Sequence, residues 1–178
     1  PEPVVAQLPG LRVIMPDLPA FGASGPFEPT WTDGGRHTVA AYADWLIAFV
    51  RHVAPTDAAA DAPVTVLGHS FGSIVVSAAL ERGLSADRVI LVTPIAAPAL
   101  AGPKGVLSRI ALGYYRVAAA MPQRAADTML GNRALVRVMS VTMARTKDRA
   151  LRRWIHAEHG RYFSAYASPA SVVEGFEA

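Results

Sequence analysis

Gly68-His69-Ser70-Phe71-Gly72 separates two stretches of sequence with different hydrophobic patterns. The residues before it, 63–67, form a short apolar run that is typical of a buried parallel strand. The residues after it, 73–82, are apolar and rich in alanine, which predicts a helix that ends at Gly83. The sequence therefore places Ser70 on a tight turn between a strand and a helix.

Such a turn gives a serine the properties of a nucleophile. G-x-S-x-G between a strand and a helix is the nucleophile elbow, in which a strained backbone exposes the serine hydroxyl. We expect Gly68 and Gly72 to let the strand and the helix pass closely without side-chain collision. The backbone N–H of Phe71, at the start of the helix, would point toward a developing oxyanion. The pentapeptide and its flanks therefore predict a nucleophilic Ser70.

Length and composition limit the class of protein. A chain of 178 residues, of which 52% are hydrophobic, is expected to form about one globular domain with a real core. The absence of cysteine excludes disulfides, thiolate metal sites and a cysteine nucleophile. No apolar run approaches the roughly 18 residues of a membrane span, and no signal peptide is visible. We therefore expect a cytoplasmic protein without an integral membrane segment; the sequence gives no signal for an oligomeric state.

Charge is distributed unevenly along the chain. Residues 1–100 carry five arginines and nine acidic residues, whereas residues 101–178 carry twelve basic and five acidic residues. This pattern favours a solvated basic helical surface, with attraction of an anionic substrate or lipid as the alternative. No helix-turn-helix, zinc or RNA-binding signature accompanies the charge, so we expect no nucleic-acid partner. The preference for arginine over lysine indicates a GC-rich bacterial source.

The first half of the chain alternates strand and helix patterns. Residues 12–15 and 88–92 are predicted strands, and residues 38–53 form a predicted amphipathic helix with Thr38 as its N-cap. With the strand before Ser70 and the helix after it, this order predicts a parallel sheet with right-handed crossovers.

The second half, after Thr93-Pro94, is helical in pattern. Pro98, Pro103 and Gly105 indicate a linker, and Ser168-Pro169 is an N-cap and N1 pair that would open a last helix. The expected helices between them span residues 108–120, 133–144 and 147–162.

Three segments, in this order, resemble the α/β-hydrolase superfamily, in its lipase/esterase-like branch with a helical cap. Residues 13–24, VIMPDLPAFGAS, look like the family's strand followed by D-x-x-G-x-G-x-S, with Ala20 where glycine is usual. The elbow at residues 68–72 is the second match. The third is residues 88–94 followed by a helical insertion, the usual site of the family's cap. The resemblance implies an α/β-hydrolase fold: a mostly parallel sheet flanked by helices, with an inserted α-helical cap.

The resemblance also implies a division of the chain. Residues 1–97 correspond to a partial hydrolase core, residues 98–167 to the cap, and residues 168–178 to the start of a helix that returns to the core. In this family the catalytic histidine and acid follow the nucleophile, beyond the cap. We therefore expect this chain to be an internal piece of a longer enzyme, with the histidine, the acid and the second oxyanion donor outside it.

The activity that the resemblance implies is that of a serine hydrolase acting on an ester, thioester or related acyl bond. Ser70 would attack a small, apolar acyl substrate, the Phe71 N–H would bind the oxyanion, and a His–Asp/Glu pair would transfer protons. No cofactor is implied. One alternative is a non-catalytic protein of this fold that binds a small apolar ligand under the cap. Another is a surface-associated protein whose Arg-rich helices contact anionic membrane.

The histidines of the chain do not form an obvious site. His37 and His52 are expected in a loop and on a helix surface, and His69 should point away from the nucleophile and pack against neighbours. His156 and His159 lack the spacing of H-E-x-x-H and have no evident third ligand, so we expect no metal site.

Two further groups of residues have structural interpretations. Asp17 precedes Ser70, and we expect it to bond backbone N–H groups of its own turn rather than to act as the catalytic acid. Aromatic and methionine side chains of the second half could line an apolar acyl pocket, although packing between helices is the expectation for each singly. These residues are Tyr114, Tyr115, Met121, Met129, Met139, Met143 and Trp154.

Overall fold

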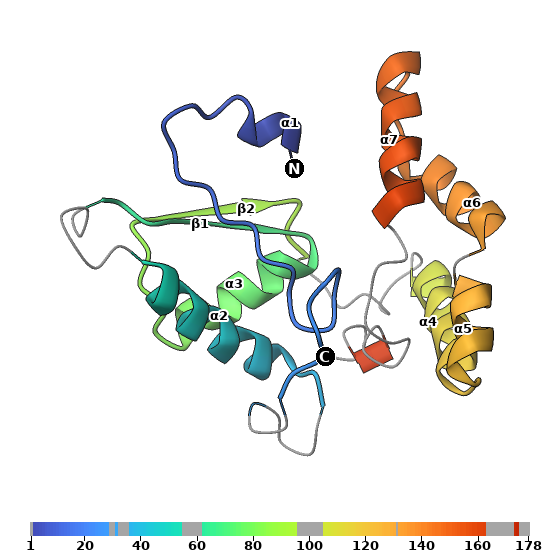
Figure 1. Ribbon diagram of the computed structural model, residues 1–178, viewed down its shortest axis with the longest axis horizontal. Helices are drawn as coiled ribbons and strands as arrows, with labels where there is room; N and C mark the ends of the chain where they lie inside the picture. The colour runs from blue at the N-terminus through green and yellow to red at the C-terminus, as the bar shows by residue number, and fades with distance from the viewer. Residues whose placement is uncertain are drawn as a thin grey trace.

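The computed structural model describes residues 2–28, 31, 36–54, 62–95, 105–130, 132–162 and 173–174. A sheet-containing half lies at one end of the molecule and a helical half at the other (Figure 1). The first half holds α1 (Glu2–Val5), α2 (Val39–Val53), β1 (Thr65–His69), α3 (Phe71–Glu81) and β2 (Arg88–Val92). The second holds α4 (Gly105–Ala119), α5 (Gln123–Leu130), α6 (Arg133–Met143) and α7 (Arg149–Tyr162).

Strands β1 and β2 pair in parallel, as the alternation of strand and helix predicts. Their register runs from Thr65 opposite Arg88 to His69 opposite Val92, and α3 connects the two strands. Helices α2 and α3 lie together on one face of this sheet (Figure 1). The core between them contains Tyr42, Ala43, Leu46, Ile47, Val66, Val75, Val76, Ala79 and Leu84.

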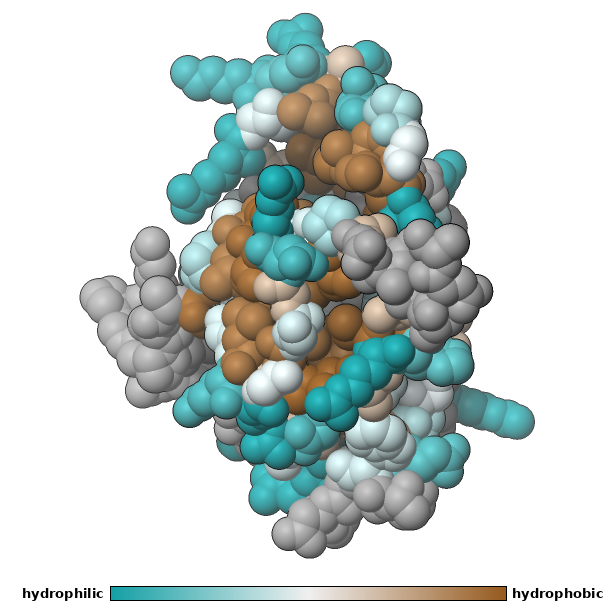
Figure 2. All heavy atoms as spheres, turned by 90° about the vertical axis from the view of Figure 1, so that its left-hand side faces the viewer, coloured by the Kyte–Doolittle hydropathy of each residue, from teal (hydrophilic) through white to brown (hydrophobic). Residues whose placement is uncertain are grey.

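The other face of the sheet is open among the described residues. Val66 is buried, whereas Leu67 is 57% exposed and every residue of β2 is exposed. Parallel sheets usually have both faces covered, and their strands are apolar for that reason. The space-filling view from the left of Figure 1 shows apolar atoms over much of the middle of that side (Figure 2).

The strand predicted at residues 12–15 is wrong, because this segment is an irregular, exposed stretch of chain. The two-stranded sheet contains only β1 and β2 among the described residues. A strand is stabilised by its ladder of hydrogen bonds to a neighbour, and apolar character alone does not supply one. The short helix α1 is also not indicated by the sequence pattern.

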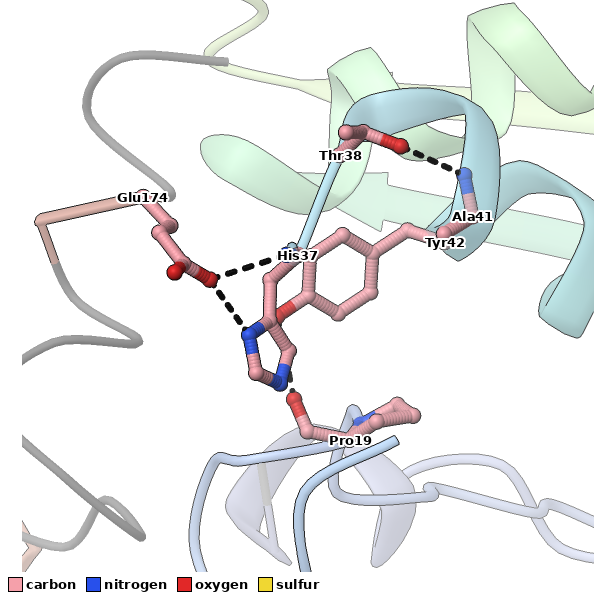
Figure 3. A network of polar contacts seen from close by, with 6 residues as sticks. All are labelled: Pro19, His37, Thr38, Ala41, Tyr42 and Glu174. Atoms are coloured by element: carbon pink, nitrogen blue, oxygen red, sulfur yellow. Dashed lines mark hydrogen bonds and ion pairs between the residues drawn. The ribbon is translucent and has the colours of Figure 1, made fainter. Parts of the chain in front are cut away.

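Helix α2 begins and packs as expected. Thr38 is its N-cap, and the Thr38 hydroxyl accepts a hydrogen bond from the N–H of Ala41 at 3.2 Å. Tyr42, fully buried, donates from its hydroxyl to the carbonyl of Pro19 at 3.0 Å. Burial and, after it, the carboxylate of Glu174 raise the pKa of Tyr42, so the hydroxyl keeps its proton. The bond fastens the loop at residue 19 to the core (Figure 3).

Tyr42→Phe should destabilise the protein, because it leaves the buried carbonyl of Pro19 without its donor. We expect the free energy of unfolding to fall by about 1–3 kcal/mol. Tyr162→Phe is the matched control, since Tyr162 is 60% exposed; its effect should stay below about 0.5 kcal/mol. Urea denaturation measures both changes, and equal effects of the two substitutions would contradict this account of the loop.

The helical half consists of two helix pairs. Helix α4 packs on α5 around Ala118, Ala126 and Leu130, and the hydroxyl of Tyr114 donates to the carbonyl of Met129 at 2.7 Å. Tyr114, Tyr115 and Met129 therefore serve in helix packing, whereas Met121 and Trp154 are 40% and 44% exposed. Of the other methionines, Met139 is half-buried, and the Met143 side chain lies outside the described part.

The sequence pattern missed helix α5. Its polar residues interrupt the apolar periodicity, and its buried side chains among the described ones are Ala126 and Leu130, one turn apart. The linker expected at Pro98 and Pro103 and the last helix expected from Ser168 lie outside the described residues.

The second pair, α6 and α7, is joined by a polar contact. The buried hydroxyl of Ser140 lies 2.6 Å from Nδ1 of His156 and 2.8 Å from Nδ1 of His159. The Ser140 hydroxyl can donate a hydrogen bond to one ring and accept one from the other, so this buried polar group has partners on α7. Within the described part of the chain, every helix is too short or too polar to cross a bilayer.

Candidate nucleophile site

Ser70 lies at the carboxyl end of β1, between the last strand residue and the first residue of α3. Its backbone has φ 53° and ψ −119°, a conformation that residues with a side chain rarely adopt. Backbone strain of this kind costs about 1–3 kcal/mol and is typical of functional sites. Ser70 is exposed. The sequence-predicted tight turn is therefore present, and its serine is accessible.

Hydrogen bonds to neighbouring elements hold the strained turn. The Ser70 N–H donates to the carbonyl of Val92 at 3.2 Å, which connects the turn to the end of β2. The Ser70 carbonyl accepts from the Ser73 N–H at 2.9 Å and from the Ser73 hydroxyl at 2.6 Å. The same hydroxyl accepts from the N–H of Ile95 at 3.2 Å.

Ser73 is a supporting residue that the sequence analysis missed. Its side chain is buried at the start of α3 and joins the elbow to the segment after β2. A serine on the apolar, inward side of a helix is a signal that could have pointed to it, because a buried hydroxyl needs partners.

Gly68 permits the close approach of strand and helix. A Cβ atom at Gly68 would lie 2.5 Å from the carbonyl oxygen of Gly72 and 2.9 Å from Cα of Ser73. Both are backbone atoms, so a change of side-chain rotamer cannot relieve the contact. At Gly72 a Cβ atom would meet nothing within 4 Å among the described residues. The close approach of β1 and α3 therefore requires glycine at position 68. At position 72 it is the backbone that takes part in the contact, and a side chain there would have room.

Gly68→Ala and Gly72→Ala should differ sharply in their effects. The first forces β1 and α3 apart and should cost about 2–3 kcal/mol of unfolding free energy. The second adds a methyl group in open space on a helix and should leave stability unchanged or raise it by up to about 1 kcal/mol. Denaturant titration of both variants measures the difference. A Gly68→Ala protein as stable as the unsubstituted chain would show that the close contact is absent in solution.

Phe71 is fixed in position as the first residue of α3. The first N–H groups of a helix have no partner within the helix, and the helix dipole favours negative charge at this end. The Phe71 ring packs on Tyr42 and Phe21, with centroid distances of 5.4 and 6.1 Å. The packing of the Phe71 ring thus fixes the position of the Phe71 backbone N–H, which lies next to Ser70 in the chain.

The loop of residues 17–25 is a structural turn. The Asp17 carboxylate accepts from the N–H of Ala23 at 2.9 Å, which confirms the expected role of this residue. Ala20, where the resemblance leads us to expect glycine, is buried and has φ 69°, so the methyl group is accommodated at the cost of strain. A Cβ at Gly22 would lie 2.3 Å from the Asp17 carboxylate carbon.

Among the histidines near the elbow, the expectation for His69 is wrong. His69 is exposed rather than packed, because alternation along β1 places it on the open face with Leu67. His52 is exposed on α2, as expected.

His37 lies in a loop but is 8% exposed, and Glu174 holds it from the far end of the chain. One Glu174 oxygen lies 2.8 Å from the backbone nitrogen of His37 and 2.6 Å from its Nδ1 (Figure 3). The buried Nε2 has no hydrogen-bond partner within the part of the chain that the structure describes. The carboxylate fixes the ring, and the contact spans 137 residues of sequence. No sequence signal pointed to this pair.

His156 and His159 both contact the hydroxyl of Ser140. Burial and, after it, the neighbouring Arg137 and Arg152 lower the pKa of His156, which favours its neutral form. Among the described residues, no group of three or more His, Asp or Glu side chains could hold a metal ion.

Replacing Ser70 by glycine should relieve the strain at the turn. Ser70→Gly and Ser70→Ala both remove the hydroxyl, but only glycine adopts a positive φ freely. We expect the glycine variant to be more stable than the alanine variant by about 1 kcal/mol. Thermal or urea unfolding of the two variants gives the comparison. An alanine variant of equal or higher stability would mean that Ser70 is unstrained in solution.

A family model described as the alpha/beta hydrolase family matches residues 3–176. Comparison with curated proteins and with solved structures gives no match. The family match covers the sheet-containing half with the elbow as well as the helical half, and it agrees with the resemblance carried by the three sequence segments. The chain belongs to the alpha/beta hydrolase family.

Proposed function

We propose that this protein is a serine hydrolase that cleaves an ester, thioester or related acyl bond, with Ser70 as its nucleophile. Membership of the family supports a hydrolase-type function. The observation that carries the finer proposal is the exposed Ser70 on a strained turn between β1 and α3. A protein that only binds ligands has no need to store strain at a serine.

In this mechanism the Ser70 hydroxyl attacks the carbonyl carbon of the acyl substrate. A histidine removes the hydroxyl proton and later gives it to the leaving group, and a carboxylate orients that histidine. Water then hydrolyses the acyl-enzyme. We propose that the histidine and the carboxylate come from sequence outside these 178 residues, because in the family that the chain resembles both follow the nucleophile, beyond the cap. His37 precedes Ser70 in the chain, and His156 and His159 both contact Ser140.

The oxyanion of the tetrahedral intermediate would lie at the start of α3. The Phe71 N–H is the donor that we assign from this chain, and the positive end of the α3 dipole adds to it. Removing one such donor typically costs about 100- to 1000-fold in kcat, so its fixed position is important. The packing of the Phe71 ring on Tyr42 supports this assignment, because it limits movement of the N–H.

Helices α4 to α7 would form a cap over the site. They lie on the side of the molecule toward which β1 runs (Figure 1), and Ser70 directly follows the last residue of β1. A helical layer at this position can exclude water from the acyl group and give the site an apolar lining. The proposed substrate is accordingly a small molecule with an apolar acyl part.

A fluorophosphonate probe tests the proposal in the protein at its full natural length. The probe should label the unsubstituted protein, and Ser70→Ala should reduce the labelling rate by about 1000-fold or more. Ser77→Ala is the matched control, because Ser77 is an exposed serine of α3, the helix that follows Ser70. It should label normally. Ester hydrolysis should likewise be lost in Ser70→Ala and retained in Ser77→Ala.

Two outcomes would reject the proposal. Undiminished labelling of a folded Ser70→Ala protein would place the nucleophile elsewhere. A folded, unsubstituted protein that neither labels nor turns over esters would favour the non-catalytic, ligand-binding alternative.

A further inference from the structure

The helical half is connected to the sheet-containing half at two places in the chain. Ile95 precedes the helical half and Glu174 follows it. The N–H of Ile95 donates to the Ser73 hydroxyl at 3.2 Å, and that hydroxyl donates to the Ser70 carbonyl at 2.6 Å. The first connection is therefore fastened directly to the nucleophile turn. The second connection is fastened to His37, and it reaches the turn by a longer route.

Glu174 contacts two nitrogen atoms of His37 through a single carboxylate oxygen. That oxygen accepts from the backbone N–H at 2.8 Å and lies 2.6 Å from Nδ1 (Figure 3). An ionised carboxylate can only accept, so Nδ1 is the donor of the second bond. Hydrogen bonds to a charged group are shorter and stronger than those between neutral groups. His37 directly precedes Thr38, the N-cap of α2, where the helix dipole also favours a negative charge.

The His37 ring belongs to a series of aromatic contacts that ends at Phe71. Its centroid lies 5.4 Å from the Phe27 ring and 6.3 Å from the Tyr42 ring. Phe27 and Tyr42 lie 4.9 Å apart, and Tyr42 meets Phe71 edge-on at 5.4 Å. Protein interiors are close-packed and transmit strain, because they contain few voids that could absorb a displacement. A shift of the His37 ring therefore reaches Phe71 by way of Tyr42.

The geometry points to Glu174 as a positioning residue that acts, through these ring contacts, on the backbone N–H of Phe71. This role rests on the proposed function, in which that N–H binds the oxyanion. Such a donor stabilises the transition state because it is fixed in place before the charge develops. Since Ser73 fastens the other connection, the attachment of the helical half and the geometry of the nucleophile turn are coupled at both ends of the insertion.

Glu174→Ala in the protein at its full natural length tests this role. We expect kcat for ester hydrolysis to fall by about tenfold, which is part of the roughly 100- to 1000-fold that the loss of an oxyanion donor costs. KM should stay within about twofold, because the oxyanion forms only in the transition state. A contact that only stabilised the fold would lower the free energy of unfolding and leave kcat of the folded protein unchanged. The Glu174 side chain is 27% exposed, so its removal leaves no closed cavity.

Glu174→Gln is the conservative variant. Its side-chain oxygen can accept from both nitrogen atoms of His37, so it should restore most of the kcat that Glu174→Ala loses.

Asp44→Ala is the matched control. The Asp44 carboxylate also accepts from two N–H groups of one residue, Nε and Nη2 of Arg82, both at 2.7 Å. Arg82 follows the last residue of α3, so this contact holds the end of α3 that is remote from Phe71. The pair is exposed, and its removal should change kcat by less than about twofold. Far-UV circular dichroism and urea unfolding check that each variant is folded under the assay conditions.

Hydrogen exchange measured by NMR tests the coupling without a substrate. The Ser70 N–H donates to the Val92 carbonyl at 3.2 Å, and the Ser73 N–H donates to the Ser70 carbonyl at 2.9 Å. Glu174→Ala should speed the exchange of both N–H groups by about tenfold, because it loosens the start of α3, and Asp44→Ala should not. If the unsubstituted protein hydrolyses no ester, the proposed function fails and this experiment alone decides the positioning role.

Three results would overturn the positioning role. The first is an unchanged kcat in folded Glu174→Ala protein while Ser70→Ala is inactive, which would leave the serine hydrolase standing without this residue. The second is unchanged exchange of the Ser70 and Ser73 N–H groups. The third is an equal loss of kcat in Asp44→Ala, which would reduce the effect to a general loosening of the fold.

Discussion

The approach of Gly68 to the first turn of α3 is the contact on which the geometry of the site depends. A Cβ atom at Gly68 would lie 2.5 Å from the Gly72 carbonyl oxygen, so β1 and α3 can meet only without a side chain there. Because the helix starts directly after the strand, one residue has to reverse the chain. That residue is Ser70, which takes φ 53°.

The strain at Ser70 is small beside the burial that α3 provides. Val75, Val76 and Ala79 of α3 are almost completely buried against α2 and the sheet. A fully buried valine contributes about 1.5–3 kcal/mol, whereas the strained residue costs about 1–3 kcal/mol. The two valines together outweigh the strain. The packing of α3 can therefore hold the serine in a conformation that the isolated segment would avoid.

Elements were predictable where local chemistry decides their ends. Thr38 caps α2, Gly83 follows α3 with φ 96°, and β2 has the predicted bounds. The predicted strand at residues 12–15 failed because a strand also needs a partner, which local sequence cannot reveal. Likewise, the contact of His37 with Glu174 joins residues far apart in the chain. The elbow itself is local, which is why its conformation could be predicted.

Supporting contacts of the site were harder to predict than the nucleophile position. Ser73 acts through hydrogen bonds to the Ser70 carbonyl and to Ile95 beyond β2, and those partners meet only once the sheet has formed. Ser140 similarly gains its role only when α6 and α7 pack. In both cases a serine on an inward helix side was visible in the sequence, but its partner was not.

The chemistry of the open face of the sheet bears on what this side of the molecule can contact. The open face of the sheet presents Leu67 of β1 and Ile90 and Val92 of β2, which are aliphatic side chains. Such a surface suits another packed layer of protein, as in other parallel sheets.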